Sequence, residues 1–293
     1  DELPQIDTIV SSKSLLLDKG INVMRMYVNG KIYGKSITLC EMSKHGEAID
    51  YVRLSNMPFE EDSLFPDKDT YLFFLHLAIC HSAIPILVDN YIGYVSNYLE
   101  DEPMIKIASQ YGFVFVRRLV KQIGVIINEK PEVFNIKIQF PFSNKHPRVS
   151  MLFDDLDGTT KMFIKGEYDY MHDYVDVPNE IISKFKKEGL RVICLSYKIF
   201  TPEDVARFNN ECRNAKTASD DYIFELINRY EKNGTLLGLI GFEHQARAGT
   251  LHLINSIKKA NIQFVMASPE PIQTLQTFAI STGIIGDTNK IYS

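Results

Sequence analysis

Five short segments between positions 113 and 165 constrain the fold more than any other feature of the sequence. Each is rich in Val, Ile and Phe, which favour extended backbone, and turn residues such as Asn128-Glu129-Lys130 and Asp157-Gly158 separate them. The segments span residues 113–116, 123–127, 133–140, 148–153 and 161–165. Short strands that follow one another across turns pair with their neighbours in opposite directions, so we predict one antiparallel sheet.

The C-terminal part of the chain has a different pattern, because segments with strand and helix character alternate after Asn233-Gly234. They are the strands 235–241 and 262–267 and the helices 251–260 and 271–281. Such alternation is typical of βα units on a parallel sheet, and we expect the N-terminal strand 6–10 to pair into it. The predicted fold class is α/β. Residues 1–25 and 235–293 form a discontinuous parallel-sheet domain, and residues 26–234 are inserted as an α+β domain built on the antiparallel sheet.

Two helices are predicted before the antiparallel sheet. The dense apolar run 71–79 indicates a buried helix that begins after Asp69 as a cap. His76 lies in this run, and we expect it to be a core or rim residue rather than a metal ligand. A second helix begins near Pro103, which is favoured in a first turn, and ends at Gly112.

Further elements are predicted on either side of these regions. Near the N-terminus we expect a loop over 11–20 and a strand over 21–28 that a turn at Asn29-Gly30 closes. Thr201, with Pro and acidic residues directly after it, is typical of a helix N-terminus. The segment 204–230 is therefore predicted to be helical, with a break near residue 217.

The charge and apolar composition exclude two classes of partner. Lys and Arg number 32 against 37 Asp and Glu, a formal net charge of −5, so the chain lacks the cationic excess that nucleic-acid binding needs. The longest apolar stretch, 71–80, is much shorter than the roughly 20 residues that cross a bilayer, so we expect no membrane insertion.

The 4 cysteines lack CxxC spacing, which favours a reduced, cytosolic compartment and disfavours zinc. Because the chain begins at Asp1 rather than Met, we expect a segment of a longer protein.

Six short motifs occur in the order and spacing of one known family. They are Ile-Val-Ser-Ser-Lys-Ser-Leu-Leu-Leu at 9–17, Asn-Gly-Lys-Ile-Tyr-Gly at 29–34, Phe-Phe-Leu-His-Leu-Ala-Ile-Cys-His at 73–81, a Phe-containing segment with a basic strand at 142–150, Lys-Gly at 165–166 and Glu-Gly-Leu-Arg at 188–191. With these motifs the chain resembles the cytosolic domains of P-type ATPases, in particular the phospholipid-flippase (type IV) branch. The resemblance implies a HAD-like phosphorylation domain with an inserted nucleotide-binding domain, on the cytosolic face of a membrane within a larger membrane protein.

The resemblance also implies a nucleotide site. Phe142 supplies an aromatic face for a purine, and Lys165 and Arg191 supply cations for the phosphates. Gly166 lacks a Cβ and lets the ligand approach the backbone. Alignment with the family places Asp101 where an acidic residue contacts the base. The alternative is structural: Phe142 as a core residue of a strand, Lys165 as a solvated strand end and Arg191 as a surface ion-pair partner.

The phosphorylation site departs from the family pattern. Ser12 stands where the family has its nucleophilic Asp, although Lys13 is retained, and Leu15-Leu16 replaces the Gly and Thr of the phosphate-binding loop. Ser268-Pro269-Glu270 replaces Thr-Gly-Asp, so a Gly is lost and the carboxylate of Glu270 is longer than the family's. An acyl phosphate requires a carboxylate nucleophile. These departures together indicate lost catalysis, and we assign no catalytic or metal-ligating residue.

Three functions are compatible with these motifs. The first is a pseudo-ATPase module that binds ATP or GTP weakly, because Glu167 opposes the phosphates, and that regulates other domains of the same membrane protein. A fused guanylyl cyclase is one candidate for the regulated domain, since protist guanylyl cyclases carry a flippase-like half. The alternatives are the cytosolic part of an active phospholipid-translocating ATPase and a structural scaffold without nucleotide binding. A requirement for Mg²⁺ is left open.

Overall fold

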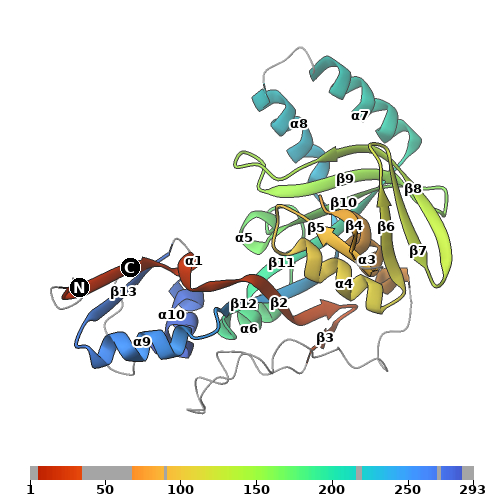
Figure 1. The fold of residues 1–293 in the computed structure, drawn as a ribbon. Coiled ribbons are helices and arrows are strands. Elements are labelled where there is room, and N and C mark those ends of the chain that lie inside the picture. Colours follow the sequence, from red (N-terminus) through yellow and green to blue (C-terminus); the bar gives the residue numbers. More distant parts are fainter. Residues whose placement is uncertain (1–5, 35–67, 89–90, 216–219, 269–271, 286–293) are drawn as a thin grey trace.

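A computed structural model describes residues 6–34, 68–88, 91–215, 220–268 and 272–285. Within these residues the strands form one nine-stranded sheet and two sheets of two strands each. Figure 1 shows the small parallel sheet with its helices to one side of the large sheet, and two long strands, β2 and β12, run between the two regions. The architecture is therefore α/β, with a large antiparallel and a small parallel component.

The nine-stranded sheet is antiparallel throughout, with strand order β3-β2-β12-β11-β10-β9-β8-β7-β6. Its strands are β2 (Leu17–Val28), β3 (Lys31–Tyr33), β6 (Phe113–Arg118), β7 (Gln122–Ile127), β8 (Lys130–Phe140), β9 (Arg148–Asp154), β10 (Thr160–Glu167), β11 (Arg191–Phe200) and β12 (Thr235–Ala246). The five segments predicted between 113 and 165 correspond to β6 through β10. The prediction of one antiparallel sheet is confirmed.

The large sheet is buried on both faces, because alternate residues of its central strands enter two different cores. Phe163 of β10 packs in the core that also contains helix α3 (Lys68–Ile79), whereas Met162 and Ile164 pack in the core on the other face. The second core is covered by α5 (Tyr168–Met171), α6 (Asn179–Lys187) and α7 (Pro202–Ala215). Helices therefore cover both faces of the sheet.

The buried helix predicted from the apolar run is α3. Nine of its residues are buried, and His76 Nε2 lies 3.1 Å from the carbonyl oxygen of Ile164. Burial lowers the pKa of His76 to about 3, so this core histidine is neutral. The helix begins at Lys68, which places Asp69 in the first turn rather than before it. The second predicted helix is α4 (Asp101–Gln110), which packs against α3.

The helical region after Thr201 consists of α7 and α8 (Asp220–Glu231). The hydroxyl of Thr201 accepts a hydrogen bond from the backbone N–H of Asp204, and the Asp204 carboxylate accepts in return from Thr201. This reciprocal cap confirms the predicted helix start. The predicted break near residue 217 lies outside the described residues.

One predicted strand belongs to a different sheet from the one expected. The segment 235–241 was assigned to the parallel sheet, but β12 pairs antiparallel with β2 and β11. A Cβ added at Gly238 would lie 2.3 Å from the carbonyl oxygen of Tyr27 in β2 and 2.7 Å from the ring of Phe73 in α3. Helix α3 therefore packs closely on this strand. A strand buried on both faces reads as a continuous apolar run in either kind of sheet, and the sequence pattern could not separate the two.

The predicted loop over 11–20 is also wrong. Ser12 caps a single helical turn, α1 (Lys13–Leu16), and β2 begins at Leu17. Leu16 is 6% exposed and packs with Phe278, so burial of this side chain orders the segment. Polar serines in the sequence suggested a loop, but tertiary packing determined the conformation.

The small parallel sheet pairs the two ends of the chain. Strand β1 (Thr8–Ser12) runs parallel to β13 (Gln263–Ala267), as predicted for the N-terminal strand. Helices α9 (Thr250–Lys259) and α10 (Ile272–Ser281) accompany it. Their core is small, and it consists of Leu16, Ala246, Ile254, Phe278, Ala279 and Ile284.

An apolar hairpin, β4 (Ile84–Val88) with β5 (Tyr91–Val95), forms the remaining sheet and was not predicted. Leu87 is 76% exposed and Tyr91 is 79% exposed. The hairpin lacks the alternation of apolar and polar residues that marks a half-buried strand in a sequence. None of the described helices combines the length and apolar character that a bilayer crossing requires.

Candidate functional site

The centre of the candidate nucleotide site is a buried ion pair. Asp101 lies in the first turn of α4 and Lys165 near the end of β10, and the Lys165 Nζ is 2.5 Å from the Asp101 Oδ1. The other carboxylate oxygen accepts hydrogen bonds from the Ser96 hydroxyl at 2.6 Å and the Ser82 backbone N–H at 3.2 Å. Both side chains of the pair are almost completely buried. The carboxylate is therefore held in one orientation by three donors.

The pKa values of the pair follow from this arrangement. Burial raises the pKa of Asp101, but the charge of Lys165 and the hydrogen bonds outweigh burial and hold it below the ordinary value of 3.8. Burial lowers the pKa of Lys165, whereas the charges of Asp101 and Glu100 raise it above the ordinary value of 10.5. Both groups are charged near neutral pH.

Gly166 follows Lys165 and lies against the side chain of Arg148. A Cβ at this position would lie 2.8 Å from the Arg148 Cγ and 3.1 Å from the Met171 Cγ. Close packing within the protein is thus sufficient to require Gly here.

Arg191 begins β11 and is bound by two carboxylates. Its guanidinium lies 2.7 Å from Glu167 and 3.6 Å from Glu100, the residue before Asp101. The side chain of Arg191 is 28% exposed. The Glu167 charge that was expected to oppose a polyphosphate is therefore bound directly to the cation that would attract one.

Phe142 lies beyond the end of β8 and is 41% exposed, so it is not the core residue of the structural alternative. Its ring meets the ring of Tyr98 edge-on, with centroids 5.9 Å apart. The backbone N–H of Tyr98 donates to the Ser96 hydroxyl, which in turn donates to Asp101. Lys165 also departs from that alternative, because it is buried rather than solvated.

The five predicted residues thus form one connected region. Phe142 reaches Asp101 through Tyr98 and Ser96, and Asp101 binds Lys165. Gly166 adjoins Lys165, and Arg191 reaches the same place through Glu100 and Glu167. The charged side chains of this region are three carboxylates and two cations: Glu100, Asp101, Glu167, Lys165 and Arg191.

A second buried ionic cluster adjoins the site and was missed at the sequence level. Arg148 pairs with Gly166 across β9 and β10, and its Nε donates to Glu231 at 2.9 Å. His146 Nε2 is 2.8 Å from the other carboxylate oxygen of Glu231, and the Arg148 guanidinium lies 3.9 Å from the Tyr174 ring centroid. Burial raises the pKa of Glu231, but His146 and Arg148 together hold it below its ordinary value. The basic strand at 148–150 was the one sequence signal that pointed to this cluster.

Ser12, the residue predicted to stand at the phosphorylation position, lies at the carboxyl end of the small parallel sheet. Ser12 is the last residue of β1 and faces Ala267 in β13, so Ser268 follows at the same edge. The Ser12 hydroxyl accepts a hydrogen bond from the Ser14 backbone N–H at 3.2 Å and lies 2.6 Å from the Ser14 hydroxyl. Ser12 therefore acts as a helix cap in this structure.

Packing places two of the residues that follow Ser12, Lys13 and Leu16. The ammonium group of Lys13 is buried and lies 5.0 Å from the centroid of the Phe278 ring. Leu16 enters the small core, and Leu15 is 64% exposed. Apolar side chains thus occupy both sides of the turn where the family has its phosphate-binding loop.

The described residues at this edge offer hydroxyl groups rather than the carboxylates that Mg²⁺ prefers. Ser12 and Ser268 supply hydroxyl groups, whereas Mg²⁺ is held in proteins chiefly by carboxylates with water and phosphate oxygens. Glu270 lies outside the described residues. Among the residues that the structure does describe, no three His, Cys, Asp or Glu side chains gather as a metal site would require.

Sequence comparison relates this α/β chain to one group of proteins. It is 24% identical to phospholipid-transporting ATPase IC of Mus musculus over 317 aligned residues, which cover 99% of this chain and 25% of that protein. Probable phospholipid-transporting ATPase 12 of Arabidopsis thaliana is 25% identical over 323 residues, covering 94% of the chain and 27% of the relative. Phospholipid-transporting ATPase 10 of the same plant is 24% identical over 335 residues, 99% and 28%. No protein-family model matches the chain.

The extent of the alignment sets what it supports. The chain spans about a quarter of the length of these relatives and aligns over nearly all of its own residues. It is therefore similar to one region of phospholipid-transporting ATPases, a flippase-like ATPase region.

Proposed function

We propose that this chain is the nucleotide-binding, cytosolic module of a flippase-like pseudo-ATPase, which acts by regulation and forms no phosphoenzyme. The observation that carries the proposal is the joint state of the two sites. The residues of the candidate nucleotide site adjoin one another around Asp101 and Lys165, while the phosphorylation position carries a Ser hydroxyl that caps a helix.

Purine binding uses the exposed part of the site. Phe142 presents an aromatic face on which a base stacks, and Arg191 lies at the rim where a phosphate approaches. Asp101 and Lys165 are buried and do not contact the ligand in this proposal. They contribute indirectly, because Asp101 binds Ser96 and so holds the Ser96–Tyr98 segment beside Phe142.

Binding of ATP or GTP is weak because the phosphates meet an acidic surrounding. Glu167 and Glu100 already bind Arg191, so a polyphosphate must displace one of them to reach the guanidinium. Three carboxylates against two cations leave the region with a formal charge of −1, which opposes a triphosphate at close range.

Phosphoryl transfer to the chain is not part of this function. An acyl phosphate requires a carboxylate at the position of Ser12, and no His stands beside Ser12 in the sequence to act as a base. The module then transmits nucleotide occupancy to other domains of a larger membrane protein, on the cytosolic face of the membrane. A guanylyl cyclase is one domain that such a module could regulate.

Calorimetric titration with ATP and GTP tests this proposal. Replacing Phe142 by Ala removes the stacking face, and loss of about 1–3 kcal/mol corresponds to a roughly 5- to 150-fold weaker affinity. Tyr222→Ala is the matched control, because both rings are 41% exposed and Tyr222 lies on α8 outside the site. Unchanged affinity in the Phe142 variant contradicts the proposed site. Absence of any heat or thermal shift at millimolar nucleotide favours the structural scaffold instead.

A further inference from the structure

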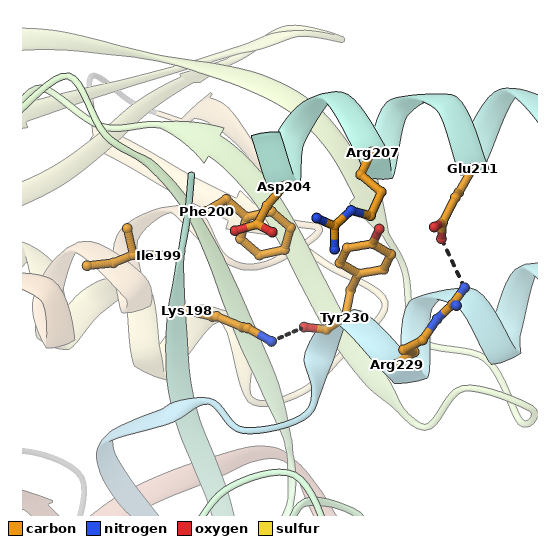
Figure 2. A pocket seen from close by; sticks show the side chains of 8 residues that line it. All are labelled: Lys198, Ile199, Phe200, Asp204, Arg207, Glu211, Arg229 and Tyr230. Atoms are coloured by element: carbon orange, nitrogen blue, oxygen red, sulfur yellow. Dashed lines mark hydrogen bonds and ion pairs between the residues drawn. The ribbon is translucent and has the colours of Figure 1, made fainter. Parts of the chain in front are cut away.

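A pocket lies away from the candidate nucleotide site, between the end of β11 and helices α7 and α8. Its volume is about 230 Å³. Figure 2 shows side chains from all three elements around one space. The residues that line it are Lys198, Ile199, Phe200, Asp204, Arg207, Glu211, Arg229 and Tyr230.

Two aromatic rings form an apolar wall of this pocket. The rings of Phe200 and Tyr230 are stacked, with centroids 5.9 Å apart and planes inclined at 25°. Phe208, which is buried, meets the Tyr230 ring edge-on at 4.8 Å. The Arg229 guanidinium carbon lies 5.9 Å from the Tyr230 ring centroid, so these three neighbours hold the Tyr230 ring in position.

The acidic groups of the pocket are already engaged. Glu211 accepts a hydrogen bond from Arg229 at 2.9 Å. Asp204 accepts two hydrogen bonds from Thr201, from the backbone N–H and from the hydroxyl, and these lower its pKa. Neither carboxylate depends on a ligand for a partner.

Two cationic groups retain hydrogen-bond donors. Lys198 donates to the carbonyl oxygens of Tyr230 and Lys232 at 3.2 and 2.9 Å, which leaves one of the three ammonium donors. Among the described residues, the Arg207 side chain makes no hydrogen bond or close ion pair, although its charge acts on Asp204 and Tyr230 and lowers the pKa of Asp204. Figure 2 shows its guanidinium extending from α7 over the pocket. Its planar donors match the oxygens of a phosphate.

We propose that this pocket binds a small phosphomonoester that carries one flat apolar ring. The phosphate binds Arg207 and the remaining donor of Lys198, and the ring lies against the wall formed by Phe200 and Tyr230. An apolar cavity of about 150 Å³ holds one benzene ring, so a pocket of about 230 Å³ accommodates a ring with one attached anionic group. Three cations and two carboxylates give the lining a formal charge of +1, which favours an anion.

Phenyl phosphate is the probe that tests this proposal, in a titration of the whole 293-residue chain followed by calorimetry. Arg207→Gln removes the charge and the fork of donors, and we expect affinity to fall by roughly tenfold or more. Arg213→Gln is the control, because Arg213 is exposed on the last turn of the same helix and does not line the pocket. Inorganic phosphate and phenol, which each carry one half of phenyl phosphate, are expected to bind more weakly than phenyl phosphate.

Three outcomes overturn the proposal. They are no binding of phenyl phosphate at millimolar concentration, equal affinity in the Arg207 and Arg213 variants, and tighter binding of either half-ligand. A further variant separates this pocket from the nucleotide site. We expect Phe142→Ala to leave the affinity for phenyl phosphate unchanged, and a loss there would place the probe at the other site and refute the assignment. Thermal unfolding of each variant verifies that it remains folded.

Discussion

Replacing Asp101 by Asn is the change that tests most directly how the candidate nucleotide site is held together. Asn keeps an acceptor for Ser96 and for the Ser82 N–H, but it removes the charge that faces Lys165. The ammonium group then remains buried, 3% exposed, without its counter-charge. Such a group is costly because desolvation is no longer offset by an opposite charge.

The expected magnitude follows from the burial of both partners. Removing one partner of a buried ion pair costs about 3–5 kcal/mol, and at roughly 2–4 °C per kcal/mol the melting temperature falls by roughly 6–20 °C. The exposed pair of Lys186 and Asp169, with side chains 43% and 55% exposed, is the matched control. Asp169→Asn should cost less than about 1 kcal/mol, because exposed ion pairs contribute little.

The pair also predicts a pH dependence with two limits. The pKa of Asp101 is below its ordinary value, so its contribution is complete above about pH 4 and is lost as the pH falls through the lower pKa of the folded state. The pKa of Lys165 is raised, so its contribution is complete below about pH 10 and is lost as the pH rises through the higher pKa of the folded state. The difference in unfolding free energy between the parent and Asp101→Asn should therefore be largest between these limits.

Urea unfolding followed by circular dichroism measures these free energies. The double variant Asp101→Asn with Lys165→Met removes the stranded charge, so we expect it to be more stable than Asp101→Asn alone. If Asp101→Asn costs no more than Asp169→Asn, the buried pair does not stabilise the fold more than an exposed pair does. A double variant that is less stable than the single one would likewise refute the reasoning.

Two further predictions concern Gly166 and Ser12. Gly166→Ala should destabilise the chain by about 1–3 kcal/mol in urea unfolding, because the new Cβ would lie 2.8 Å from the Arg148 Cγ. Gly20→Ala is the control and should have a much smaller effect, because nothing lies within 4 Å of a Cβ there. Equal effects of the two substitutions would show that Arg148 moves aside freely. Labelled ATP with Mg²⁺ should yield no acid-stable, hydroxylamine-sensitive phosphoenzyme in the parent, which has no carboxylate at position 12. The same result is expected for Ser12→Asp, because the apolar Leu16 still occupies the adjoining turn. A labelled acyl phosphate in Ser12→Asp would show that a carboxylate alone restores the site.

Local patterns in the sequence determined the elements whose character does not depend on distant partners. The strands between 113 and 165, the apolar run of α3 and the cap formed by Thr201 follow from β propensity, burial and side-chain hydrogen bonding within a few residues. The motifs that the chain shares with P-type ATPases likewise indicate Phe142, Lys165 and Arg191 without reference to their geometry.

Only the tertiary structure decided which of these elements meet and what their side chains bind. The strand after Gly234 belongs to the antiparallel sheet, where it pairs with β2. The two strands are about two hundred residues apart in the sequence, and no local sequence period encodes such a pairing. Lys165 was expected to meet a ligand's phosphates, and the fold instead buries it against Asp101, 64 residues away in sequence. A buried charge must find its counter-charge wherever the chain brings one, so its partner is a property of the packed molecule and not of the neighbouring sequence.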